Sequence, residues 1–164
     1  MAGFSAHVDQ AIHNCKTLKS INQNVPDSWD WQVTTAFYTA VHLVNGHMAK
    51  IANHHYKSHV SVKQALFCGK DVAVPERIYL SYVKLESLSR RARYLCNESP
   101  DKSPEQAHIT YEIHLAKAIR HLDVVAGYLC KLHGISLEKY ELNCKELNSD
   151  KLNFFLHKPE SKAA

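Results

Sequence analysis

The chain has 164 residues, of which 45% are hydrophobic and 22% are charged, and its formal net charge is +4. This length fits one domain, and this composition excludes a wholly disordered chain. With only five glycines and five prolines, a collagen-like or loop-dominated architecture is also excluded. The charge is too small to identify a nucleic-acid partner by itself. Any function must therefore be inferred from how particular residue types are distributed along the sequence.

Hydrophobic residues recur every three or four positions through most of the chain, which predicts helices. Residues 4–18 carry the first such stripe, and the turn at 24–28, with Pro26, ends it. Residues 29–52 form the second predicted helix, and a polar stripe runs beside its apolar face. We interpret that stripe, Tyr38, His42 and Asn45, as a buried hydrogen-bonded cluster.

Three further helices are predicted from their end signals. Ser58 is placed to cap a short helix that Gly69 ends, and Pro75 with Glu76 begins a fourth helix that reaches Cys96. The sequence Ser103-Pro104-Glu105-Gln106 predicts a capping box for the longest stripe, which ends at Gly134. A short helix is expected near residues 137–147, and a frayed end at 158–164.

Amphipathic helices joined by short loops bury their stripes against one another. We therefore predict an all-α fold, an antiparallel up-and-down bundle of four to five helices. The bundle is expected to occupy residues 1–134, and residues 135–164 are expected to form a C-terminal extension.

The location expected is cytoplasmic, without membrane contact. The five cysteines are an odd number with no Cys-x-x-Cys pair, which is typical of reduced thiols. The N-terminus has no secretory signal pattern. The most apolar stretch, 122–132, is interrupted by Asp123 and Lys131 and is shorter than the roughly 20 apolar residues that a bilayer requires.

Basic residues concentrate in two stretches. Residues 31–70 contain no Asp or Glu, while four lysines and five histidines stand there. Further along, Arg90 and Arg93 lie one helical turn apart beside Tyr94, which suits phosphate binding and base stacking. The alternative is that the lysines only solvate helix faces and that an arginine pairs with Glu86. The candidate residues for anion or RNA binding are Lys57, His59, Lys63, Arg90, Arg93 and Tyr94.

Neither a metal nor a cofactor is expected. His55 and His59 stand four residues apart, but no carboxylate or cysteine near them completes the three or four ligands of a typical zinc site. The chain also has no Gly-x-Ser-x-Gly elbow and no glycine-rich phosphate loop.

Three elements of the sequence resemble the HEPN superfamily of small helical proteins. Residues 30–45, DWQVTTAFYTAVHLVN, resemble its DWaVtaaFYaAlHlV signature, and Ser58-His59 and the segment 89–94, SRRARY, follow at familiar distances. The resemblance covers about residues 5–132. It implies an up-and-down bundle, commonly dimeric, that associates with RNA or nucleotides in toxin–antitoxin, defence or RNA-processing systems. Catalytic members carry an Arg followed by four to six residues and a His, and this chain lacks that motif in its usual form.

The leading hypothesis is therefore a non-catalytic, homodimeric HEPN-like module that binds RNA, a nucleotide or a protein partner. The enzyme alternative is a metal-independent ribonuclease in which His59 acts as acid or base and Arg90 or Arg93 stabilises the transition state. A third alternative is a structural subunit that binds another protein through an apolar patch. The first two require the two basic stretches to lie side by side.

Overall fold

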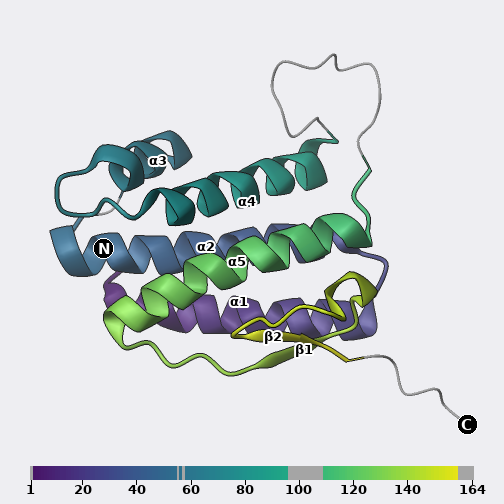
Figure 1. Ribbon diagram of the computed structural model, residues 1–164. Helices are drawn as coiled ribbons and strands as arrows, with labels where there is room; N and C mark the ends of the chain where they lie inside the picture. The colour runs from purple at the N-terminus through teal and green to yellow at the C-terminus, as the bar shows by residue number, and fades with distance from the viewer. Residues whose placement is uncertain (1, 55, 57, 96–108, 159–164) are drawn as a thin grey trace, which may run out of the picture.

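The protein folds as an all-α bundle, as the hydrophobic spacing predicts. The computed structural model describes residues 2–54, 56, 58–95 and 109–158. Within these residues there are five helices and a two-stranded sheet (Figure 1). The helices are α1 (Phe4–Asn24), α2 (Trp29–Ala52), α3 (His59–Cys68), α4 (Glu76–Tyr94) and α5 (Glu112–His133).

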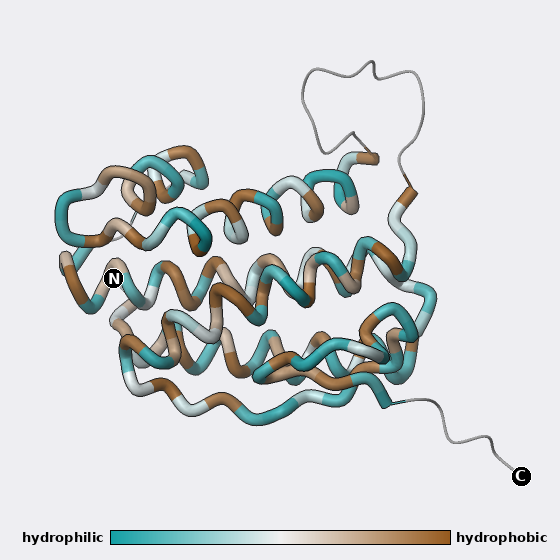
Figure 2. Tube along the Cα trace, in the orientation of Figure 1, coloured by the Kyte–Doolittle hydropathy of each residue, from teal (hydrophilic) through white to brown (hydrophobic). Residues whose placement is uncertain are grey.

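The four long helices run in alternating directions along the chain (Figure 1). α2 packs against α1, α4 and α5, and the short α3 lies beside α4. Hydrophobic positions recur along each helix, between hydrophilic ones (Figure 2). This spacing turns one face of each helix towards the others, and the core contains Leu18, Phe37, Tyr82 and Ile119.

Three predicted helix ends are confirmed by their local geometry. The Ser58 hydroxyl accepts a hydrogen bond from the Ser61 backbone N–H at 3.1 Å, so Ser58 caps α3. A Cβ at Gly69 would stand 2.4 Å from the Ala65 carbonyl oxygen, so only glycine fits where α3 ends. Gly134, with φ +68°, ends α5 in the left-handed conformation that glycine adopts at low cost.

The start of α5 differs from the prediction. The expected capping box at 103–106 lies outside the described residues, but Ile109 and Thr110 are not helical, and α5 begins only at Glu112. Tyr111 is extended, and its backbone N–H donates to His114 Nδ1 at 3.0 Å. The His114 side chain thus satisfies a backbone donor near the start of α5.

The prediction of a short helix at 137–147 is also wrong. Instead, the chain forms β1 (Tyr140–Leu142), a single 3-10 turn η1 (Lys145–Leu147) and β2 (Phe155–His157). The two strands pair in parallel, with Tyr140 opposite Phe155. Tyr140 and Leu142 are buried on either side of Glu141, which is the period of two that a strand requires. These apolar side chains join the core of the bundle, so the extension and the helices share one core.

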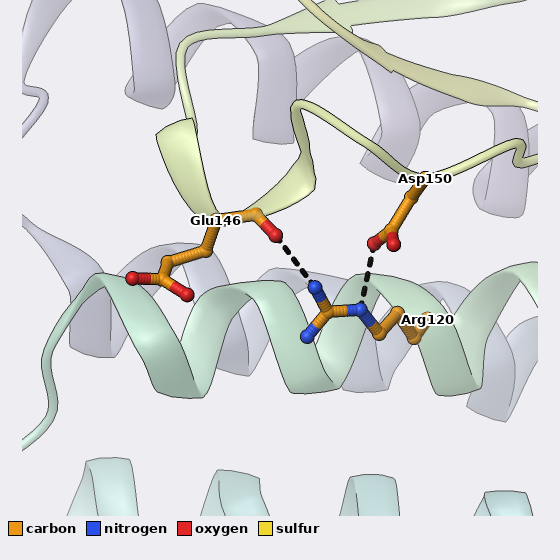
Figure 3. Close-up of polar contacts among 3 residues, drawn as sticks. All are labelled: Arg120, Glu146 and Asp150. Carbon is orange, nitrogen blue, oxygen red and sulfur yellow. Dashed lines mark hydrogen bonds and ion pairs between the residues drawn. The ribbon is translucent and has the colours of Figure 1, made fainter.

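Polar side chains of α5 hold the extension in place. The Arg120 guanidinium donates from Nε to Asp150 Oδ2 at 2.7 Å and from Nη2 to the Glu146 carbonyl oxygen (Figure 3). The buried Asp123 carboxylate accepts from the backbone N–H groups of Asn153, at 3.0 Å, and Phe154, at 2.9 Å. It also accepts from the Asn153 side-chain amide at 2.8 Å. Asp123 is therefore the main polar anchor between α5 and the extension.

Asn22 of α1 supplies a second anchor on the other side of the extension. Its Oδ1 accepts from the Asn143 backbone N–H at 2.6 Å, and its Nδ2 donates to the Asn143 carbonyl at 3.1 Å. The same Nδ2 donates to Gln32 Oε1 of α2 at 2.8 Å. One buried amide thus links α1, α2 and the extension.

Replacing Asp123 by Ala is expected to lower the free energy of unfolding by about 3 kcal/mol, because three donors lose a buried, charged acceptor. The control is Asp150→Ala, which removes the partly exposed ion pair with Arg120 and is expected to cost less than about 1 kcal/mol. Urea unfolding of both variants measures the difference. Equal losses would show that Asp123 is not the main anchor.

Candidate anion-binding surface

The two basic stretches meet at one turn of α2. The ring centroid of His59, at the start of α3, lies 5.3 Å from that of Phe37. The guanidinium carbon of Arg93, near the end of α4, lies 6.0 Å from the ring centroid of Tyr38. Phe37 and Tyr38 are neighbours whose rings are 5.5 Å apart. Residues far apart in the sequence thus reach adjacent positions of the central helix.

Among the described residues, Arg93 is positioned by aromatic and backbone contacts and not by a carboxylate. Its guanidinium carbon lies 5.0 Å from the Tyr94 ring centroid, and its Nη1 donates to the Tyr94 hydroxyl at 3.4 Å. Its Nε donates to the Ser89 carbonyl at 3.3 Å. Because no ion pair of Arg93 is found within the described residues, its positive charge stays uncompensated there. Tyr94 itself is 65% exposed.

The other predicted cations differ in their surroundings. Arg90 is exposed on α4. Arg91 donates from Nη2 to the Ile109 carbonyl at 2.8 Å and so holds the chain entering α5. Lys57 lies outside the described residues.

Lys63 forms an ion pair and is a weaker candidate than the sequence indicates. Its Nζ lies 2.8 Å from Oε2 of Glu86, whose side chain is only 12% exposed. The alternative interpretation expected an arginine of α4 to pair with this glutamate, and the structure places Lys63 there instead. A nearly buried carboxylate requires a partner, so most of the Lys63 charge is compensated within the fold.

The predicted buried cluster on α2 is wrong for Tyr38. Tyr38 is 37% exposed and His42 is half-buried, whereas Asn45 is buried. His42 Nδ1 lies 3.2 Å from Nδ1 of His7 on α1. These three residues lie along the edge of the contact between α1 and α2, so they differ in exposure.

An open hollow of about 370 Å³ that was not predicted from the sequence lies between α1 and α2. Its walls are formed by polar side chains of the two helices. These polar residues recur every three or four positions, and this spacing was the signal in the sequence that could have predicted the hollow. Trp31, at its edge, is 63% exposed. The lining residues are Gln10, His13, Asn14, Thr17, Trp31, Thr34, Thr35, Tyr38 and His42. None of them is Asp, Glu, Lys or Arg.

A second hollow, also of about 370 Å³, lies between α4, α5 and the extension. Arg77 and Lys151 contribute to its lining, as does Asp123, whose carboxylate already accepts three hydrogen bonds from the extension. Arg77 stands at the opposite end of α4 from Arg90 and Arg93. It is therefore separate from the surface at Phe37 and Tyr38.

A histidine pair at the far end of α2 is structural. His47 Nε2 lies 3.1 Å from the Val72 carbonyl oxygen, which can only accept, so this nitrogen carries the proton. His47 Nδ1 then accepts from His133 Nε2 at 2.8 Å. Burial lowers the pKa of His47, and burial together with the neighbouring His47 and Lys50 lowers the pKa of His133 to about 4. Both rings are therefore neutral at pH 7.

The described residues contain no group of three or more His, Cys, Asp or Glu side chains that could hold a metal ion. Burial raises the pKa of the Cys15 and Cys144 thiols to about 12 and that of Cys130 to about 11. These three thiols stay protonated at neutral pH, so none of them is an activated nucleophile.

Comparison with known proteins adds no relative: no family profile, no curated protein and no solved structure matches this chain. None of the helices among the described residues has the length and apolar character needed to cross a membrane.

The stability of the fold is expected to fall as the pH drops from about 6.5 to about 4. In this range the unfolded histidines bind protons, whereas the native His47–His133 pair does not, so protonation favours the unfolded state. The variant His133→Gln keeps an amide donor but cannot titrate. Between pH 7.5 and 4.5, the wild type should lose about 1–2 kcal/mol more unfolding free energy than this variant, measured by urea denaturation. Parallel pH profiles of the two proteins would contradict the assignment.

Proposed function

We propose that the chain is a non-catalytic HEPN-like module that binds single-stranded RNA on a cationic surface made of Tyr38, His59, Arg90, Arg93 and Tyr94. The observation that carries the proposal is the position of Arg93. Its guanidinium lies against the rings of Tyr38 and Tyr94 and has no carboxylate partner within the described residues. A phosphate would supply the missing negative charge.

Phosphate binding and base stacking need different side chains, and the cationic surface offers both. Within the described residues, the guanidinium of Arg93 has donors left after its contacts with Ser89 and Tyr94. The exposed rings of Tyr38 and Tyr94 offer stacking faces beside it. An anionic strand that lacks stacked partners satisfies both groups at once, which favours single-stranded RNA over a small inorganic anion.

His59 adds to this surface. Its ring packs against Phe37, and among the described residues its nitrogens have no hydrogen-bonding partner. An imidazole N–H in that position can donate a hydrogen bond to a phosphate oxygen.

The resemblance of residues 30–45, 58–59 and 89–94 to HEPN proteins supports the same class of ligand. As part of the proposal, the module is a homodimer in the cytoplasm and serves a toxin–antitoxin, defence or RNA-processing system. The absence of the usual Arg-x(4–6)-His spacing favours binding without cleavage.

One observation favours a ribonuclease as the second candidate. His59 and Arg93 contact neighbouring residues of α2, so an acid–base group and a cation approach one region. Incubation of a labelled RNA pool with the protein and a chelator separates the two functions. Intact RNA supports the binding module, and His59-dependent cleavage supports the enzyme.

Arg93→Ala is expected to weaken binding of a fluorescein-labelled RNA strand of about 12 nucleotides by about fivefold to tenfold, because one charge-assisted phosphate contact is lost. Fluorescence anisotropy between about 50 and 300 mM NaCl should also show a smaller salt dependence, by about 0.7 in the slope of log K against log[salt].

Arg77→Ala is the matched control, because it removes the same side chain from the exposed first turn of the same helix. It should leave the affinity within about twofold of the wild type, because Arg77 lies at the opposite end of α4 from the proposed surface. A binding constant that does not change with salt, or equal effects of the two substitutions, would refute the proposed surface.

A further inference from the structure

We infer that the hollow between α1 and α2 holds an unpaired base of the RNA strand whose phosphate lies at Arg93. This inference rests on the proposed function and adds a base-binding site to its phosphate contact. The hollow is the one of about 370 Å³ described above, bounded by Trp31 and Tyr38 on α2 and by polar residues of α1.

The lining of the hollow defines the chemistry of its ligand. Amide, hydroxyl, imidazole and aromatic groups surround it, and no Asp, Glu, Lys or Arg does. A phosphate would find no lysine or arginine in this lining, and an ammonium group would find no carboxylate. A neutral, planar ligand with hydrogen-bonding edges fits this set, and a nucleobase is such a ligand.

Trp31 supplies the stacking face. Trp31 is 63% exposed, although tryptophan has a large hydrophobic side chain that proteins usually bury. Trp31 and Tyr38 are seven residues apart on one helix, so they share a face and lie about 10 Å apart along its axis. Each ring therefore offers its own stacking surface at the edge of the hollow.

Polar groups on the α1 side can read the edge of a base. The Gln10 side-chain amide donates to Asn14 Oδ1 at 3.0 Å, and this bond fixes the orientation of the Asn14 amide. The Asn14 Nδ2 and Gln10 Oε1 atoms have no partner among the described residues, so they offer N–H donors and a carbonyl acceptor. This is the pattern by which amide side chains bind base edges.

Tyr38 connects the hollow to the cationic surface. The same ring lines the hollow and lies 6.0 Å from the Arg93 guanidinium carbon. A strand that places a phosphate at Arg93 therefore brings a neighbouring base to Tyr38 and Trp31. Bases paired in a duplex cannot reach these rings, so the hollow selects for single strands.

The test uses Trp31 as its own reporter. The chain has two tryptophans, and the Trp29→Phe substitution leaves Trp31 as the only one while keeping an aromatic ring against the core. Single-stranded RNA of about 12 nucleotides should quench Trp31 fluorescence. A duplex of the same sequence should quench it far less, and an abasic strand should bind without quenching.

Two substitutions separate stacking from charge. Trp31→Ala should weaken binding of the single strand about tenfold without changing the salt dependence, because Trp31 contacts no phosphate. The matched control, Trp31→Phe, keeps a stacking ring and should stay within about threefold of the wild type.

Each outcome decides between the two proposals. If Arg93→Ala weakens binding but Trp31→Ala does not, and fluorescence stays constant, the base site is wrong and the cationic surface stands. If the protein binds no RNA at any salt concentration, both proposals fail. If a neutral oligosaccharide quenches Trp31 while RNA leaves it unchanged, the hollow is a sugar site and the inference is overturned.

Discussion

The burial of α2 is the constraint on which the rest of the structure depends. Apolar side chains point from this helix towards α1, α4 and α5, so it can be removed from water only if those helices surround it. Phe37, fully buried, shows the consequence most directly, since its ring contacts His59 of α3 and Tyr82 of α4. Covering Phe37 brings α3 and α4 over one turn of α2. The positions of His59 and Arg93 follow from hydrophobic packing, before any ligand is considered.

The charges that the fold uses differ from those that it leaves available. Lys63 compensates Glu86, and Arg120 binds Asp150 together with the Glu146 carbonyl. These cations hold elements together, and a ligand would have to compete with the groups that they already contact. Within the part of the chain that the structure describes, Arg93 is held instead by rings and by one backbone carbonyl, which position its guanidinium without neutralising it. A net charge of only +4 is therefore compatible with a local concentration of positive charge at the candidate surface.

Local signals in the sequence predicted the helices. The features that the sequence did not predict depend on tertiary contacts. Ser58 and Gly134 mark helix ends because capping depends on neighbouring residues alone. The strands of the extension have three residues each, too few to show a period, and Asp123 of α5 fixes the position of the segment before β2. The candidate residues His59 and Arg93 were identified by type and spacing. Their approach to one turn of α2, and the pairing of Lys63 with Glu86, depend on how α3 and α4 pack.

The error at Tyr38 bears most on function. Helical spacing placed this residue beside an apolar stripe, from which burial was inferred, but the edge of the α1–α2 contact leaves the ring 37% exposed. Because it is exposed, one face of α2 can present an aromatic ring both to the uncharged hollow and to Arg93. A buried Tyr38 would have separated these two regions. The proposed phosphate contact and the proposed base site thus involve different side chains joined by one ring, so salt should affect the first and strand pairing the second.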